Sequence, residues 1–348
     1  MHPRPGGPPP RATKISATEI RLREMSELAV VILAHSDAEH VRRLITALPD
    51  VRVFLHCDAK APESIRHAMV DGLPSRVTLC QARSASLASW SLVEPELAAL
   101  RSALSSTTAQ HIAVCSGADY PLVSVEQLNR TLGELRGTSL FWNTPVPFAP
   151  WGTPRNDDGG MWRFNHRFIT RNNDVVYVRG VPLRWPVKRQ IPEGLDLRAS
   201  SQWKIYARHH AELLLRIHDE NPNLVDFWRT SLVPEESFAA SVLGSRALAG
   251  NDALAPSDLT AWYIHWPDKN AHHPSWLTDA HFTALARAAG GGPPLTTSLR
   301  DGANGSLNDA TEGTAVSPNR PQRALFARKF STRIDTIVLD RIDAELRA

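Results

Sequence analysis

A strand, a helix and a second strand follow one another directly near the start of this chain. Residues 28–34 form a continuous apolar run, which is typical of a strand buried on both faces of a parallel sheet. His35-Ser36-Asp37 then offers a helix cap, and apolar residues at helical spacing run through 41–48 until Pro49. A second strand is predicted at 51–56. Because this order defines a βαβ unit with a right-handed crossover, it predicts an α/β fold.

The alternation continues beyond this unit. Helices are predicted at 63–70 and 92–105, and strands at 76–80 and 112–115. Repeated alternation predicts a mainly parallel central sheet that is covered by helices. From 141 to 174 prolines and glycines interrupt any regular pattern, so we expect an ordered loop region over the sheet edge. Helical spacing returns at 207–218 and 235–243.

Length and composition are compatible with one large domain. The 348 residues are 42% hydrophobic, which is enough to bury a sizeable core. We expect a disordered tail at 1–27 and a single domain at 28–348. Within the domain the sequence divides into 28–140, 141–285, a low-complexity loop at 288–322 and a C-terminal segment with a helix at 323–348.

Charge and cysteine usage exclude several classes of protein. The formal net charge of +3 is small for this length, and no nucleic-acid-binding motif accompanies it, so we expect no nucleic-acid partner. The first 27 residues contain no apolar run typical of a signal peptide or membrane anchor, which leaves at most peripheral membrane contact.

Three cysteines without metal-ligand spacing indicate reduced thiols, and we expect a cytoplasmic protein. His265, His272 and His273 match no common zinc spacing, so no metal site is predicted.

The segment Ser116-Gly117-Ala118-Asp119-Tyr120-Pro121 follows an apolar strand. It carries the Asp119 carboxylate to the rim of the sheet, where open α/β proteins bind ligands. Glycine and proline after a strand also form ordinary turns, so the segment alone leaves both interpretations open.

Several separated segments together resemble one enzyme family. The chain is similar, from about Leu28 to Phe330, to the core-2/I-branching β-1,6-N-acetylglucosaminyltransferases and peptide O-xylosyltransferases. The matching segments occur in the family's order: 30–35, Phe54-Leu55-His56-Cys57-Asp58, 116–122, Ser200-Ser201-Gln202-Trp203, Val233-Pro234-Glu235-Glu236-Ser237 and Leu325-Phe326-Ala327-Arg328-Lys329-Phe330.

This resemblance implies a nucleotide-diphospho-sugar transferase fold of the GT-A type. It implies inverting transfer of a sugar from a UDP donor, with N-acetylglucosamine as the first candidate sugar and xylose as the second. The acceptor would be a carbohydrate or a glycosylated small molecule or peptide. The resemblance also implies that the reaction needs no metal ion. This chain has no Asp-x-Asp triplet at a strand end, which fits that implication, so no cofactor is expected. The animal members' disulfide-forming cysteines and membrane anchor are absent here, which fits a bacterial member. By the same resemblance 28–140 would bind the nucleotide, 141–285 the acceptor, and 323–348 the phosphates.

The resemblance assigns Glu236 as the general base, because an inverting transfer needs a group that takes the acceptor hydroxyl proton. The alternative is that Glu235 and Glu236 only complement a helix N-terminus. Arg328 and Lys329 would neutralise the diphosphate in place of a metal, the alternative being a solvated basic turn.

The remaining assignments also follow the family. Uridine recognition falls to Ala34, His35, Ser36, His56 and Asp58, and Asp119 would contact the transferred sugar. Alternatively, Asp58 caps a turn and His56 is a half-buried core histidine. The acceptor-side residues would be Arg163, Arg167, Gln202, Trp203 and Glu235. Trp203 could stack on a sugar or pack in the core.

Two functions therefore remain open at this stage. The first is a UDP-sugar-dependent glycosyltransferase. The second is a catalytically silent carbohydrate-binding protein of the same fold, which would need neither Glu236 nor Lys329.

Overall fold

The structure is a computed structural model, and it describes residues 27–153, 156–267, 271, 273–290 and 323–348. The tail predicted at 1–27 lies outside the described residues except for Glu27. The predicted loop at 288–322 lies outside them from 291 onward. Its first two residues correct the predicted boundary, because Ala288 and Ala289 end a helix and are buried in the core.

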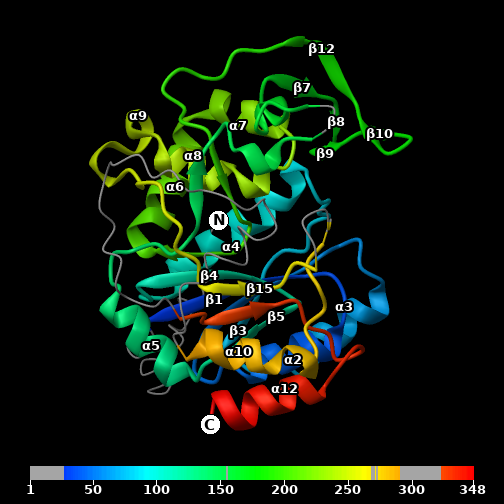
Figure 1. Cartoon of the computed structure of the whole chain (residues 1–348), viewed down its shortest axis with the longest axis vertical. Helices are drawn as coiled ribbons and strands as arrows, with labels where there is room; N and C mark the ends of the chain where they lie inside the picture. The colour runs from blue at the N-terminus through cyan, green and yellow to red at the C-terminus, as the bar shows by residue number, and fades with distance from the viewer. Residues whose placement is uncertain (1–26, 154–155, 268–270, 272, 291–322) are drawn as a thin grey trace, which may run out of the picture.

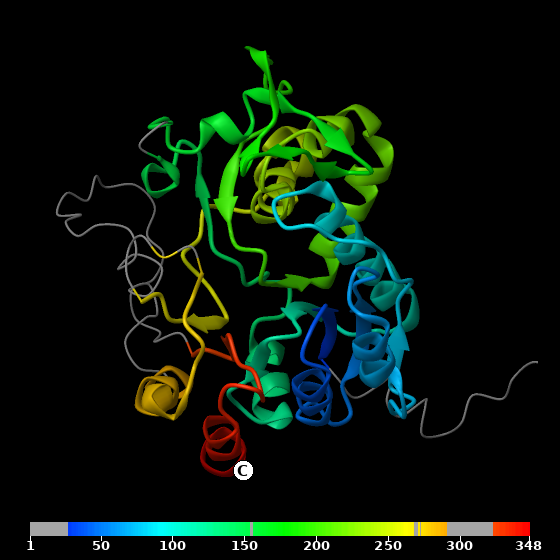
Figure 2. The same ribbon diagram turned by 90° about the vertical axis from the view of Figure 1, so that its right-hand side faces the viewer.

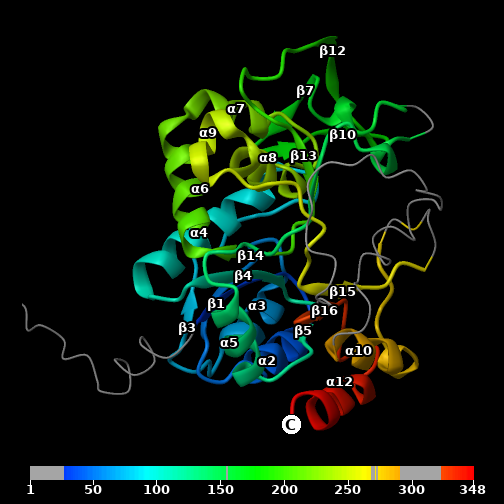
Figure 3. The same cartoon turned by 60° about the vertical axis from the view of Figure 1, so that its left-hand side comes forward.

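A five-stranded sheet forms the centre of the fold, in the order β14-β4-β1-β2-β3 (Figure 3). The strands β1 (Leu28–Ala34), β2 (Arg52–Cys57), β3 (Val77–Leu79) and β4 (His111–Ser116) are parallel. The strand β14 (Lys204–Ala207) runs antiparallel to β4 at one edge. This arrangement confirms the predicted α/β fold with a mainly parallel sheet.

Helices cover both faces of this sheet (Figure 1). The helices α2 (Ala38–Thr46), α3 (Glu63–Val70) and α5 (Val125–Glu134) contribute to the core cluster that also takes Val30 and Ile32 of β1. The helices α4 (Trp90–Ser106), α6 (Arg208–Glu220) and α8 (Phe238–Gly244) form the other cluster, with Ala29 and Val31. Alternate residues of β1 thus enter opposite cores, because successive side chains of a strand point to opposite faces.

A second, three-stranded sheet lies beside the first. Its strands are β15 (Trp262–Ile264), β16 (Phe326–Arg328) and β5 (Asp119–Pro121). The helix α10 (Phe282–Ala289), the helix α12 (Ile337–Arg341) and a π-helical turn (Ile342–Leu346) complete this layer. The C-terminal segment therefore joins the same core as the first strand.

Short strands and turns lie above the central sheet beside helices that include α6 and α8, as Figures 1 and 2 show. Its prolines and glycines limit each strand to a few residues. The paired strands are β6 (Asn143–Pro145) with β13 (Arg198–Ser200), β7 (His166–Phe168) with β12 (Arg184–Lys188), β8 (Thr170–Arg171) with β9 (Asp174–Val175), and β10 (Tyr177–Val178) with β11 (Val181–Pro182).

The remaining elements are short helices. They are α7 (Pro222–Arg229), α9 (Arg246–Ala249) and the 3-10 turns Ala149–Trp151, Met161–Arg163, Pro234–Glu236, Gly250–Asp252 and Asp279–His281. The helix predicted at 235–243 needs correction: α8 begins only at Phe238, because the Ser237 backbone leaves helical geometry between the 3-10 turn and the helix. Within the described residues no helix has the length and apolar character needed to cross a membrane.

Candidate active site

The carboxyl ends of β1 and β2 lie side by side at one edge of the central sheet. Asp58, directly after β2, donates its backbone N–H to the carbonyl of Ala34 at 2.8 Å. Gly117, after β4, bonds to β1 in the same way, and a Cβ there would lie only 3.0 Å from the Ala34 Cβ, so this close approach favours glycine. Four of the predicted donor residues, Ala34, His35, Ser36 and Asp58, are therefore brought together, with His35 and Ser36 exposed.

The loop 81–89 packs against the end of β2. The His56 ring is 2% exposed, and its Nε2 accepts the N–H of Arg83 at 3.1 Å. Burial lowers the pKa of His56, so the ring is neutral at pH 7. Asp58 Oδ1 accepts the N–H groups of Lys60 at 2.8 Å and Ala85 at 3.3 Å. Asp58 thus caps a local turn, as its alternative interpretation required, and His56 is a buried histidine with a hydrogen-bond partner; direct contact of either residue with uridine stays a prediction.

Asp119 is fully buried and holds Arg328. The two residues are opposite each other in the β5–β16 pair, with Nε of Arg328 3.2 Å from Oδ1 of Asp119. The other oxygen accepts the indole N–H of Trp262 at 2.9 Å and the backbone N–H of Ser116 at 3.0 Å. Burial raises the pKa of Asp119, and the charge of Arg328 opposes this shift. Since each oxygen has partners, the geometry makes Asp119 a positioning group for Arg328; its contact with the donor sugar stays a prediction.

Trp203 lies beneath Arg328. The indole ring is 8% exposed and belongs to the core, with the Arg328 guanidinium 4.1 Å above its centre. Gln202 beside it is also buried. The structure thus places Trp203 in the core and under a cation, while its stacking on a sugar stays a prediction.

Lys329 lies in a segment that is anchored to the end of β1. Its ammonium is 4.4 Å from the ring centre of Trp276, and burial together with Arg328 lowers its pKa. Asp37, directly after the exposed His35-Ser36 pair, accepts hydrogen bonds from the hydroxyls of Ser331 and of Thr332, the latter at 2.9 Å. This contact brings the predicted phosphate-binding segment next to the predicted nucleotide-binding loop.

Glu235 is buried in the 3-10 turn Pro234–Glu236. It is 4% exposed, and its Oε1 accepts the N–H of Ala88 at 2.8 Å, while Oε2 is buried without a hydrogen-bond partner among the described residues. Burial, and next the charge of Glu236, raise the pKa of Glu235 to about 8. At pH 7 this carboxyl is therefore mostly protonated.

Glu236 has the opposite environment. Its side chain is 40% exposed, and Oε2 lies 3.3 Å from Nη1 of Arg163, whose guanidinium covers the Trp151 ring at 3.8 Å. The charge of Glu236 also acts on Arg328. The accessible carboxylate thus favours the charged form of Arg328, although the two residues come from segments far apart in the sequence.

Not every predicted acceptor residue joins this group. Arg163 positions Glu236, but Arg167 is exposed and lines a separate cavity beside α7. Sequence reasoning did not assign a role to Trp151, Trp262 or Trp276, each of which contacts a predicted site residue. Their only signal in the sequence is the tryptophan itself, in segments without regular spacing.

The part of the chain that the structure describes holds no group of three or more His, Cys, Asp or Glu side chains arranged to bind a metal ion.

Comparison with known proteins gives one substantial match. The sequence model of the Core-2/I-branching enzyme family matches residues 28–286, which include Glu235 and Glu236 but end before Arg328 and Lys329. No curated protein matches the chain. Among solved structures, one described as a glucose-1-phosphate thymidylyltransferase from Bacillus anthracis in complex with sucrose shares 9% identity at a TM-score of 0.26, over 54% of this chain and 74% of that chain. Similarity of that degree indicates neither a shared fold nor a shared function.

Proposed function

Because the chain belongs to the Core-2/I-branching enzyme family, which implies glycosyltransferase activity, we propose that it transfers a sugar from a UDP donor to an acceptor hydroxyl with inversion. The donor sugar we propose is N-acetylglucosamine, with xylose second. The acceptor is a carbohydrate or a glycosylated molecule, and the transfer needs no divalent cation.

One observation supports this proposal above the others: the half-exposed Glu236 carboxylate is held by Arg163 at 3.3 Å. In the proposed step an acceptor hydroxyl oxygen bonds to the anomeric carbon while the bond from that carbon to the diphosphate oxygen breaks. Glu236 takes the hydroxyl proton as the new bond forms. UDP leaves with the electron pair.

Cations stabilise the departing diphosphate in this proposal. Arg328 is held by Asp119 and Trp203, and Lys329 is held next to the end of β1 by the contacts of the following residues with Asp37. Both groups are therefore pre-arranged, which is how a protein stabilises charge that develops in a transition state. They supply the positive charge that a metal ion provides in many transferases.

Glu235 is the less suitable base. Its carboxyl is mostly protonated at pH 7 and almost inaccessible. A protonated carboxyl cannot accept the hydroxyl proton, whereas the half-exposed Glu236 can reach an acceptor.

The test is UDP release from a panel of UDP-sugars in the presence of EDTA. The wild type should release UDP from one preferred donor, and Glu236→Gln should lose roughly 100-fold or more in kcat, the scale of general-base removal. Glu126→Gln, an exposed glutamate on α5, is the matched control and should behave as the wild type.

Three outcomes would contradict the proposal. A loss in Glu235→Gln without a loss in Glu236→Gln would move the base to Glu235. Turnover that EDTA abolishes would contradict metal independence. No UDP release from any donor, together with binding of a glycan, would favour the silent carbohydrate-binding protein.

A further inference from the structure

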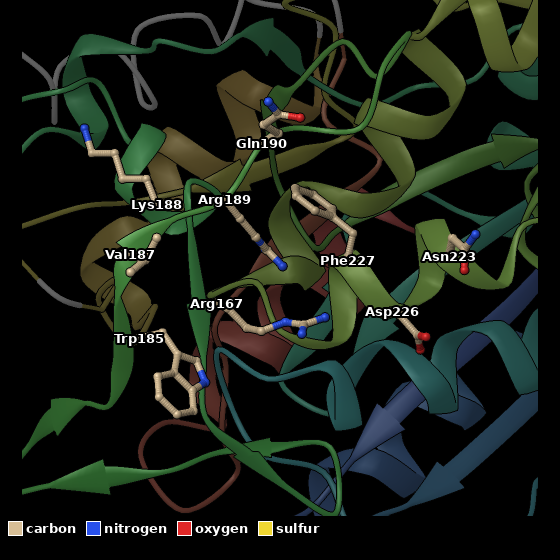
Figure 4. A pocket seen from close by; sticks show the side chains of 9 residues that line it. All are labelled: Arg167, Trp185, Val187, Lys188, Arg189, Gln190, Asn223, Asp226 and Phe227. Carbon is tan, nitrogen blue, oxygen red and sulfur yellow. The ribbon is translucent and has the colours of Figure 1, made fainter.

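A cavity of about 620 Å³ lies outside the group around Glu236, between α7 on one side and β12 with the two residues after it on the other (Figure 4). Arg167, Lys188 and Arg189 bring three cationic side chains to its lining. The one acidic side chain in the lining, Asp226, is already paired with Arg229 at 3.0 Å. The cavity therefore carries excess positive charge.

The Arg189 guanidinium is held in place in the cavity wall without a neutralising charge. Its three donor nitrogens bond to neutral acceptors: the Phe164 carbonyl at 2.8 Å and the hydroxyls of Thr230 and Ser231 at 2.7 Å each. Its guanidinium lies 4.0 Å from the ring centre of Phe227. Within the described part of the chain no carboxylate pairs with it. A partly buried cation without a counter-charge is costly unless an anion binds beside it.

Arg167 adds a second cation at the same place. Its charge acts on Arg189, and Figure 4 shows both guanidinium groups turned toward α7. Burial, and next the charge of Arg167, lower the pKa of Arg189 to about 10. Arg167 itself has no ion pair with any described residue. Two neighbouring guanidinium groups repel each other, and an oxyanion that accepts from both would remove that repulsion.

The rest of the lining suits a sugar. Trp185 presents an exposed indole ring, a surface on which sugar rings stack, and Gln190 and Asn223 add amide groups that can hydrogen-bond to hydroxyls. A cavity with an aromatic ring, amides and paired arginines therefore matches a saccharide that carries a negative charge better than a free ion or a neutral sugar.

The cavity is also connected to the catalytic group. Arg189 bonds to Phe164, the residue after Arg163, and Arg163 holds Glu236. It also bonds to Ser231, shortly before the turn that carries Glu236. The cavity thus adjoins the two segments that position the proposed base.

We propose that this cavity binds an acidic sugar unit, so that the acceptor is an anionic oligosaccharide whose carboxylate or sulfate group bonds to Arg167 and Arg189. That the bound sugar belongs to the acceptor of the transfer rests on the proposed function. The binding itself involves no donor and can be measured separately.

The experiment titrates the full chain, without any UDP-sugar, with oligogalacturonate and with sulfated dextran fragments. Methyl-esterified oligogalacturonate and plain dextran fragments are the neutral counterparts. At least one charged oligosaccharide should bind, and its neutral counterpart should not. Arg167→Gln should weaken that binding about tenfold or more, the scale of a charge-assisted hydrogen bond. Because the Arg167 side chain is exposed and makes no hydrogen bond or ion pair with the described residues, its substitution should leave folding intact.

Arg171→Gln is the matched control, since it removes the same charge from an exposed position on β8 outside the cavity. Equal losses in Arg167→Gln and Arg171→Gln would show a net-charge effect and overturn the proposal. Equal affinity for the charged and neutral oligosaccharides would also overturn it. So would inorganic phosphate that binds as tightly as the oligosaccharide, since the site would then serve a free ion. Failure of UDP release would contradict the proposed function and leave these binding results unaffected.

Discussion

Two adjacent glutamates in the 3-10 turn Pro234–Glu236 have opposite environments. Glu235 points into the protein against the Ala88 N–H, and Glu236 remains accessible beside Arg163. One residue step along a tight turn is enough to separate a protonated, structural carboxyl from a carboxylate that can act as a base. The identity of the residues alone does not reveal this difference, because it arises from burial.

The raised pKa of Glu235 predicts a pH-dependent stability. With a pKa of about 8 in the folded chain and 4.5 as its ordinary value, Glu235 keeps a proton that the unfolded chain releases between these limits. The free energy of unfolding should therefore fall as pH rises through this range, by at most about 1.4 kcal/mol per pH unit. In Glu235→Gln the side-chain amide oxygen can still accept the Ala88 N–H, but no group titrates there. The contribution of residue 235 to the pH dependence of the free energy of unfolding should therefore disappear.

Urea unfolding at several pH values between 4.5 and 8 checks this prediction. The wild type should lose stability relative to Glu235→Gln as pH rises, while Glu126→Gln should follow the wild type. Parallel curves for wild type and Glu235→Gln would show that the buried carboxyl does not titrate in this range.

At the scale of elements, the contact between the end of β1 and the segment after β16 assembles the proposed donor site. Asp37 has a left-handed backbone (φ 49°), caps α2 through the N–H of His40, and accepts from Ser331 and Thr332. The following prediction separates the positioning role of Asp37 from the proposed phosphate contact of Lys329.

Asp37→Asn and Lys329→Ala should differ in their effects. Asparagine tolerates the left-handed backbone but replaces the charged acceptor, so we expect unfolding to become about 1–3 kcal/mol easier and UDP to bind more weakly. Lys329→Ala should weaken UDP binding about tenfold or more with little change in stability. Calorimetric titration with UDP and urea unfolding measure the two effects. Arg333→Ala, an exposed cation in the same segment, is the control; UDP affinity that Lys329→Ala leaves unchanged would rule out the phosphate contact.

The elements themselves were largely predictable from sequence. β1 and α3 have the predicted bounds, because a continuous apolar run and a helical spacing are local signals. The boundary at α8 was missed, since the Ser237 backbone geometry is not encoded in the spacing of apolar residues. The contacts of Arg328 with Trp203, and of Asp37 with Ser331, join segments that are distant in the sequence. Such contacts arise only when the sheet forms, so no local pattern could predict them.

At the scale of the whole molecule, the end of the chain packs against its beginning. Arg43 of α2 lies 2.8 Å from Asp340 and 2.7 Å from Asp343, and Asp343 also accepts the Tyr120 hydroxyl at 2.9 Å. Leu339 is fully buried in the core cluster that includes β1. The chain that follows Arg328 and Lys329 is thus fixed at two points, first by Asp37 at Ser331 and Thr332 and then by the packing of α12.

Packing of α12 on the common core predicts that Leu339→Ala destabilises the entire domain. Removing this buried side chain leaves a cavity and should cost about 2–5 kcal/mol. Ile337, two residues earlier on the same helix, is 61% exposed, so Ile337→Ala should change the free energy of unfolding by no more than about 0.5 kcal/mol. Urea unfolding followed by circular dichroism measures both variants. A single transition at lower urea in Leu339→Ala would show that the C-terminal helix and the central sheet unfold together. If both variants unfold as the wild type does, α12 is not part of the core, and its packing does not anchor the segment that carries Lys329.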